Sequence, residues 1–150
     1  MEALGEAGAE GVPRDLTRIG PLLDIGYPML TLDHVQIAAP PGCEAAARAF
    51  FSGLLGLPEL SKQGETASSG GAWFSLGGGE LHVGVEAEHR PSRKAHVALR
   101  LPDEASLVAL AERLAAAGHA VRWDTRLPDV RRFFTDDPWG NRVELLVRPG

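Results

Sequence analysis

The sequence has little cysteine, no long apolar run and no excess of basic residues. Its one cysteine, Cys43, excludes an intramolecular disulfide framework and is typical of a reducing compartment. No run of about 18 apolar residues is present, and no basic segment precedes an apolar stretch near the start, so neither a transmembrane helix nor a signal peptide is expected. The 15 basic and 20 acidic residues do not provide the basic surface that nucleic acid or an anionic membrane requires. We therefore expect a cytoplasmic protein that binds neither nucleic acid nor membrane.

The chain is long enough for one domain, and its composition changes near residue 30. A length of 150 residues is typical of a single domain with a hydrophobic core. The first part includes MEALGEAGAEGVPRD, which is rich in Gly, Ala and Glu and has no apolar periodicity. Residues 1–30 are therefore predicted to be a disordered or loosely packed extension. Residues 31–150 carry regular strand, helix and turn patterns, which predict a single folded domain.

One series of strands and helix occurs twice in this domain. Short β-branched or alternating segments bounded by Gly and Pro predict strands, and apolar residues at helical spacing predict one helix in each half. The first half has a strand over 31–39, a helix over 43–55 and strands over 57–62, 72–78 and 80–87. The second half repeats this order over 94–101, 103–118, 120–124, 130–136 and 141–147. We therefore predict two β-α-β-β-β modules, at 31–88 and 94–148.

A constant offset relates the two modules. His34 precedes His96 by 62 residues. The helix-ending glycines, Gly56 and Gly118, have the same offset, and so do the turn glycines, Gly78 and Gly140. A second pair of polar residues, His82 and Glu144, is also 62 residues apart. Several independent landmarks that share one gapless offset indicate a duplicated unit.

Strand alternation places four potential metal ligands on the face away from the helices. Successive side chains of a strand point to opposite faces. Val35 and Ile37 suit packing beneath the helix, which leaves His34 on the other face. The same reasoning directs three further side chains away from their apolar neighbours: His82, His96 and Glu144. Each module thus supplies two such side chains, and pairing the modules would bring all four together.

Three imidazoles and one carboxylate form a suitable ligand set for one divalent Zn, Ni, Co, Fe or Mn ion. Glu80 and Glu86 share the face of His82, and one of them would replace it as a ligand if the register differed by two residues. Alternation also yields candidates for the wall of a substrate pocket: Gln36, Trp73, Arg100, Arg132, Phe134 and Trp139. For the aromatic members, ordinary core packing is the competing interpretation. His89, in the link between modules, is expected at the surface.

Four segments resemble the vicinal oxygen chelate superfamily, also called the glyoxalase/bleomycin-resistance/dioxygenase family: LDHVQIA, ARAFFSGLLGL, AHVALRL and DPWGNRVELL. The resemblance extends over residues 31–147. It implies an α+β fold, in which two tandem βαβββ modules form a cupped, barrel-like mixed sheet with the helices on the outer face. It also implies a divalent metal in the cup, with ligand positions at His34, His82, His96 and Glu144.

The resemblance implies metal-assisted chemistry on a small molecule. Glyoxalase I usually carries a glutamate at the position of His82, which argues against a plain glyoxalase I. The chemistry common to the family is bidentate binding of vicinal substrate oxygens to the metal, which stabilises an enediolate or oxyanion. We therefore predict a lyase or isomerase in which Glu144 is both a ligand and the catalytic base. The alternative is a non-catalytic drug- or metabolite-binding protein of the bleomycin-resistance type.

The oligomeric state decides how the ligands meet. Swapped pairing of modules is common in the resembling family, and twofold symmetry is the commonest in oligomers, so a homodimer is expected. The four ligands meet either within one chain or across two chains, and the sequence leaves both arrangements open.

Overall fold

The computed structural model of the chain describes residues 30–148. The prediction of a disordered extension over residues 1–30 therefore lies outside the described residues, apart from Leu30. From Leu32 onward the chain forms one compact unit. Within the described range, none of the helices is both long and apolar enough to span a membrane.

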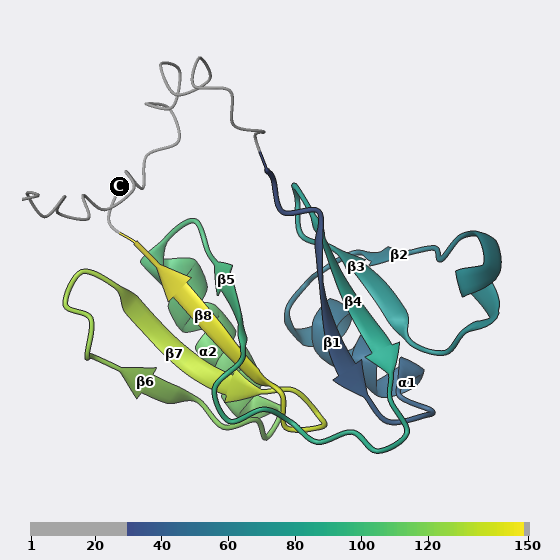
Figure 1. The fold of residues 1–150 in the computed structure, drawn as a ribbon. Coiled ribbons are helices and arrows are strands. Elements are labelled where there is room, and N and C mark those ends of the chain that lie inside the picture. The colour runs from purple at the N-terminus through teal and green to yellow at the C-terminus, as the bar shows by residue number, and fades with distance from the viewer. Residues whose placement is uncertain (1–29, 149–150) are drawn as a thin grey trace, which may run out of the picture. The chain divides into compact units, whose positions relative to one another are not determined.

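The β-α-β-β-β series occurs twice, as the sequence predicts (Figure 1). The first module consists of β1 (His34–Ala39), α1 (Glu44–Ala47), η3 (Arg48–Leu54), β2 (Glu59–Leu60), η4 (Gly64–Ser68), β3 (Ala72–Ser75) and β4 (Glu80–Val85). The second module consists of β5 (Val97–Arg100), α2 (Glu104–Ala116), β6 (Arg122–Asp124), β7 (Arg131–Asp136) and β8 (Arg142–Val147).

The two modules have the same sheet topology. One sheet has the order β1-β4-β3-β2 and the other β5-β8-β7-β6. In each sheet the first and last strands of the module pair in parallel, and the other pairs are antiparallel. Gln36 lies opposite His82 in the first sheet, and Ala98 lies opposite Glu144 in the second. Residues that are 62 positions apart in the sequence therefore occupy equivalent positions in the two sheets.

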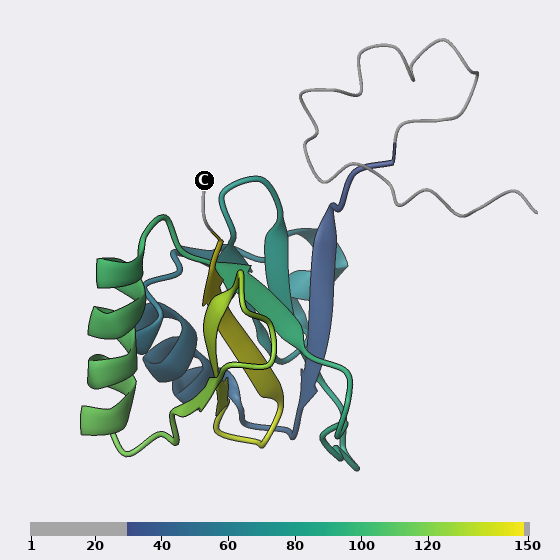
Figure 2. The same cartoon turned by 90° about the vertical axis from the view of Figure 1, so that its left-hand side faces the viewer.

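Both main helices lie on the same side of the two sheets (Figure 2). The predicted α+β fold of two βαβββ modules with helices on the outer face is thus confirmed. Within residues 30–148 the strands form two separate four-stranded sheets and do not close into one barrel. The faces opposite the helices are those on which the sequence places the four metal-ligand candidates.

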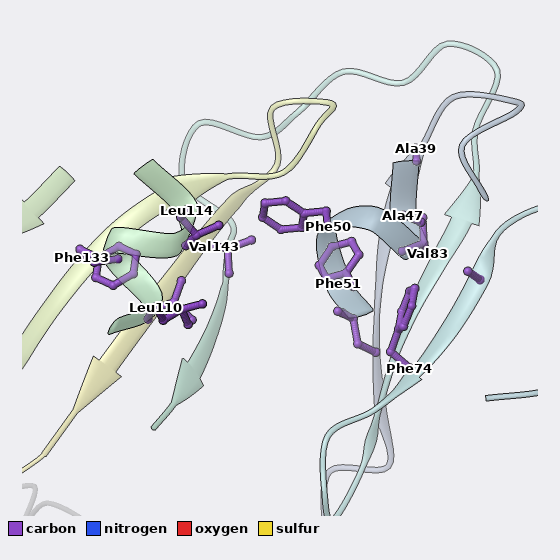
Figure 3. Close-up of a cluster of buried hydrophobic side chains, with 14 of the residues drawn as sticks. Ala39, Ala47, Phe50, Phe51, Phe74, Val83, Leu110, Leu114, Phe133 and Val143 are labelled. Carbon is purple, nitrogen blue, oxygen red and sulfur yellow. The ribbon is translucent and has the colours of Figure 1, made fainter. Parts of the chain in front are cut away.

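One hydrophobic cluster joins the two modules. It contains side chains of both helical segments and of the helix-facing strand positions, among them Phe50, Phe51, Phe74, Leu81, Leu114 and Val143. Phe50 points from η3 toward Leu114 and Val143 of the second module (Figure 3). Burying a large apolar side chain contributes about 1.5–3 kcal/mol. The shared core therefore holds the helix-facing side of every long strand and leaves the opposite side for polar residues.

The first helix differs from a regular α-helix. Four residues of α1 lead directly into a π-helical segment, η3, in which Leu55 N–H donates to Phe50 C=O at 3.0 Å. The adjacent Phe50 and Phe51 in this segment are both buried, each about 1% exposed. The helix-ending glycines are confirmed, since Gly56 and Gly118 have φ of 76° and 85°.

Candidate functional site

The first pair of ligand candidates lies in contact on the sheet of module one. His34 begins β1, and His82 lies on the neighbouring strand β4. Their rings stack with centroids 4.4 Å apart. Trp73 of β3 stacks on His82 as well, at 4.2 Å and an interplanar angle of 6°. Since β4 lies between β1 and β3, His82 is held between two flat rings and is 7% exposed.

Carboxylates fix the orientation of both rings of this pair. Asp33 Oδ2 lies 2.7 Å from His34 Nδ1, and Glu80 Oε2 lies 2.7 Å from His82 Nε2. A histidine that donates one ring N–H to an oxygen presents the lone pair of the other nitrogen, which is the usual arrangement around a metal-binding imidazole. Glu80 thus lies beside His82, as strand alternation predicts. Glu86 is directed elsewhere, with its Oε2 4.0 Å from His89 Nδ1.

The second pair of ligand candidates is joined by a direct hydrogen bond. His96 Nε2 lies 2.8 Å from Glu144 Oε2, although 48 residues separate them. His96 Nδ1 lies 2.9 Å from the carbonyl oxygen of Lys94, to which it donates. This bond leaves Nε2 as the nitrogen directed at Glu144. Phe134 of β7 contacts the His96 ring edge to face, with the ring centroids 5.7 Å apart. Phe134 lies opposite Glu144 in the second sheet, as Trp73 lies opposite His82 in the first.

Glu144 is buried, and its second oxygen is bound by an arginine. Glu144 is 5% exposed, and Arg132 donates to its Oε1 at 3.0 Å. The same guanidinium donates to Asp124 Oδ1 at 3.1 Å. Burial alone would lower the pKa of Arg132, but the hydrogen bonds to Asp124 and Glu144 outweigh it, and the pKa is raised. Hydrogen bonding by Arg126, with a contribution from Arg132, lowers the pKa of Asp124 to about 2.

The donor chemistry of both pairs fits a divalent transition metal. His34 and His82 each contact a carboxylate oxygen through one ring nitrogen, whereas His96 contacts the Lys94 carbonyl through Nδ1 and Glu144 through Nε2. Arg132 binds only one oxygen of Glu144. Imidazole and carboxylate are the ligands that such ions bind. However, the part of the chain that the structure describes contains no group of three or more His, Cys, Asp or Glu side chains placed to hold one ion. A single chain therefore presents the four candidates as two pairs.

The predicted pocket-wall residues fall into two groups. Four of the six adjoin the ligand pairs: Trp73, Phe134 and Arg132 as described, and Gln36, whose side chain covers Gly84 next to His82. A Cβ on Gly84 would lie 2.7 Å from Gln36 Nε2, so a side chain at this position would displace the end of Gln36. Arg100 lies opposite Leu146 and is exposed, and Trp139 packs against the hydrophobic cluster.

Two features of this region escape sequence reasoning. His89 was expected at the surface, and this expectation is wrong: its side chain is 6% exposed, because the link between modules packs against both of them. Asp137 is 4% exposed and accepts hydrogen bonds from Trp139 N–H and Asn141 N–H, while burial raises its pKa. The side chain of Asn141 donates to the Ala38 carbonyl at 2.8 Å and so ties the last turn to β1. The DPWGN motif predicts the turn but not this bond.

Comparison with known proteins identifies a family and several similar structures. Residues 31–145 match the model of the glyoxalase/bleomycin resistance protein/dioxygenase superfamily. A search of curated protein sequences gives no match. A structure assigned to the glyoxalase family, from Bacillus anthracis, is 38% identical, with a TM-score of 0.76 over 82% of this chain and 98% of that one.

More distant structures share the fold. Lactoylglutathione lyase from Agrobacterium tumefaciens is 19% identical, with a TM-score of 0.62 over 81% of this chain and 96% of that one. A point mutant of the fosfomycin resistance protein FosX from Listeria monocytogenes was solved with Mn(II) and 1S,2S-dihydroxypropylphosphonic acid. It is 16% identical, with a TM-score of 0.67 over 81% of this chain and 94% of that one.

Proposed function

Because the chain belongs to the glyoxalase/bleomycin resistance protein/dioxygenase superfamily, we propose that it is a divalent-metal-dependent enzyme of the lyase or isomerase type. Its substrate is a small molecule that binds the metal through two vicinal oxygens. The single cysteine supports a cytoplasmic location. Residues 31–150 form the catalytic domain, and residues 1–30 have no part in the chemistry.

One observation carries this proposal. In each module, the ligand candidates of the first and last strands lie in contact on the face opposite the helices. His34 with His82 and His96 with Glu144 occupy equivalent positions, with the same 48-residue separation. A half-buried histidine on one strand is common in proteins, but two matched pairs of metal-binding side chains are not explained by packing.

The four ligands come together in a homodimer. Since each chain presents two separate pairs, His34 and His82 of one protomer combine with His96 and Glu144 of its partner. A twofold axis then forms two equivalent sites. The Mn(II) in the FosX structure supports a divalent ion of this class, and Zn, Ni, Co and Fe suit the same ligands.

The chain's own residues accept the proton, orient the ligand side chains and line the pocket. When bound, the metal would supply Lewis-acid stabilisation of an enediolate or oxyanion. Arg132 holds Glu144 Oε1, so Oε2 is the oxygen available both as a ligand atom and as the base, and it would accept the substrate proton only while it is not bound to the metal. The Lys94 carbonyl keeps the Nε2 of His96 directed at the site. Gln36, Trp73 and Phe134 line the substrate pocket, with Arg100 and Trp139 as outer contacts.

Metal analysis of the purified protein tests the proposal. We expect close to one divalent ion per chain after metal supplementation, since a site with four ligands retains its ion. Glu144→Gln should lower metal content and turnover, whereas Glu112→Gln, an exposed change on α2, should leave both unchanged. Metal content and turnover equal to those of the wild type in Glu144→Gln would show that this residue is neither a metal ligand nor the base. Less than about 0.2 ions per chain in the wild type would favour the non-catalytic binding protein instead.

A further inference from the structure

His89 is a buried histidine whose ring nitrogens form no hydrogen bond. Its side chain is 6% exposed, and among the described residues neither Nδ1 nor Nε2 has a hydrogen-bond partner. The nearest charged atom is Glu86 Oε2, which is 4.0 Å from Nδ1 and too distant for a hydrogen bond. A buried polar group without a partner costs free energy unless a ligand or ordered water completes it. The position of His89 therefore points to a bound group.

His89 lines a cavity between the free edges of the two sheets. β1 and β5 are edge strands of their sheets, and the segment that links β4 to β5 runs from one sheet to the other (Figure 1). The cavity has a volume of about 390 Å³. Val35, Ile37 and Val97 contribute apolar wall. This is space for a small organic molecule, beyond what one water molecule occupies.

The polar side chains of the cavity favour an anion. The charged residues that line the cavity are Arg90, Arg142 and Glu86, so the lining is net positive even with neutral histidines. The Asp137 carboxylate near His89 already accepts hydrogen bonds from Asn141 and from Trp139 N–H. Arginine binds carboxylates and phosphates with paired N–H donors, and a neutral imidazole adds one donor.

We propose that this cavity binds a small organic anion, with its carboxylate or phosphoryl head between His89, Arg90 and Arg142. The apolar part of the molecule lies against Val35, Ile37 and Val97. His96, a metal-ligand candidate, lines the same cavity. The identification of this anion with the substrate rests on the proposed function, because the other end of the molecule would then reach the metal. Binding of the anion to this cavity does not depend on the proposed function.

Titration calorimetry on chelator-treated protein tests the site without any metal. The probes are 2-hydroxybutyrate for a carboxylate head and propyl phosphate for a phosphoryl head, and the tighter one identifies the head group. His89→Phe keeps an aromatic ring and removes both nitrogens, so we expect probe binding to weaken about tenfold, as for one hydrogen bond to a charged group. Arg142→Gln should weaken binding by a similar factor.

Arg48→Gln is the matched control, because Arg48 pairs with Glu59 on module one and does not line this cavity. It removes the same charge and should leave probe binding unchanged. Circular dichroism confirms that each variant is folded, and if His89→Phe does not fold, Arg142→Gln carries the test. Equal binding by all variants, or no binding of either probe, would overturn the proposal. Failure of metal binding would instead affect only the proposed function.

Discussion

The Glu144 carboxylate lies within a chain of alternating charges that crosses the second sheet. His96 and Arg132 contact its two oxygens, and Arg132 continues to Asp124, which also binds Arg126. A buried carboxylate is costly unless its oxygens are bound, so these contacts allow Glu144 to remain buried within the sheet. Arg132, which the sequence predicts to line the substrate pocket, also binds Glu144 Oε1 and so fixes the orientation of this carboxylate.

Asp124→Asn should alter the dependence of stability on acid. Because the folded pKa of Asp124, about 2, lies below its ordinary 3.8, its ion pairs stabilise the native state above about pH 4. That contribution declines as pH falls from 4 toward 2. The free energy of unfolding of the wild type should therefore exceed that of Asp124→Asn by a constant amount from pH 5 to 7, and the difference should shrink in acid. A difference that does not change down to pH 2 would contradict the ion-pair interpretation.

The elements show which local patterns are reliable. Helix α2 is followed by Gly118, the helix-ending glycine that the sequence predicts. At its start, Asp103 is the N-cap residue and accepts a hydrogen bond from Ser106 N–H at 2.7 Å. In the first module, the predicted α-helix continues from α1 into the π-helical segment η3, in which Phe50 and Phe51 are both buried. In β4, Val85 lies on the same face as the buried Leu81 and Val83, but it is 42% exposed and lies beside Gly70.

Loss of the N-cap should destabilise the protein by a small, specific amount. Asp103→Ala removes the hydrogen bond to Ser106 N–H and should cost about 1 kcal/mol in free energy of unfolding, measured with urea. Asp103→Asn keeps the acceptor and should remain within a few tenths of a kcal/mol of the wild type. An equal loss in both variants would show that charge, and not the cap, is responsible.

At the scale of the molecule, the shared core joins the two modules, while the ligand pairs stay apart. Phe50 contacts the ring of His119 at 4.9 Å, and Arg113 donates to the Leu54 carbonyl at 3.0 Å. These contacts hold the helices of both modules together on one side. A complete four-ligand site then requires a second copy of the chain, which is the arrangement we propose.

Complementation between two defective chains distinguishes the arrangements. One chain carries His34→Ala and His82→Ala, and the other carries His96→Ala and Glu144→Gln. If the site spans two chains, a purified heterodimer has one intact site and one site in which all four ligands are replaced, so it should bind about half the metal of the wild type. Each defective homodimer should bind almost none. A heterodimer without metal would mean that the ligands meet within one chain.

Sequence patterns by themselves determined the module order, the helix ends and the face on which each ligand candidate lies, because strand alternation and glycine stops are local properties. The 62-residue offset also determined which strands correspond. Only the tertiary structure decided what those side chains contact. The burial of His89, the binding of Arg132 to Glu144 and the bond from Asn141 to Ala38 all join segments far apart in the chain. The grouping of the four candidates into two pairs has the same physical reason, since it depends on how the modules pack and not on any local pattern.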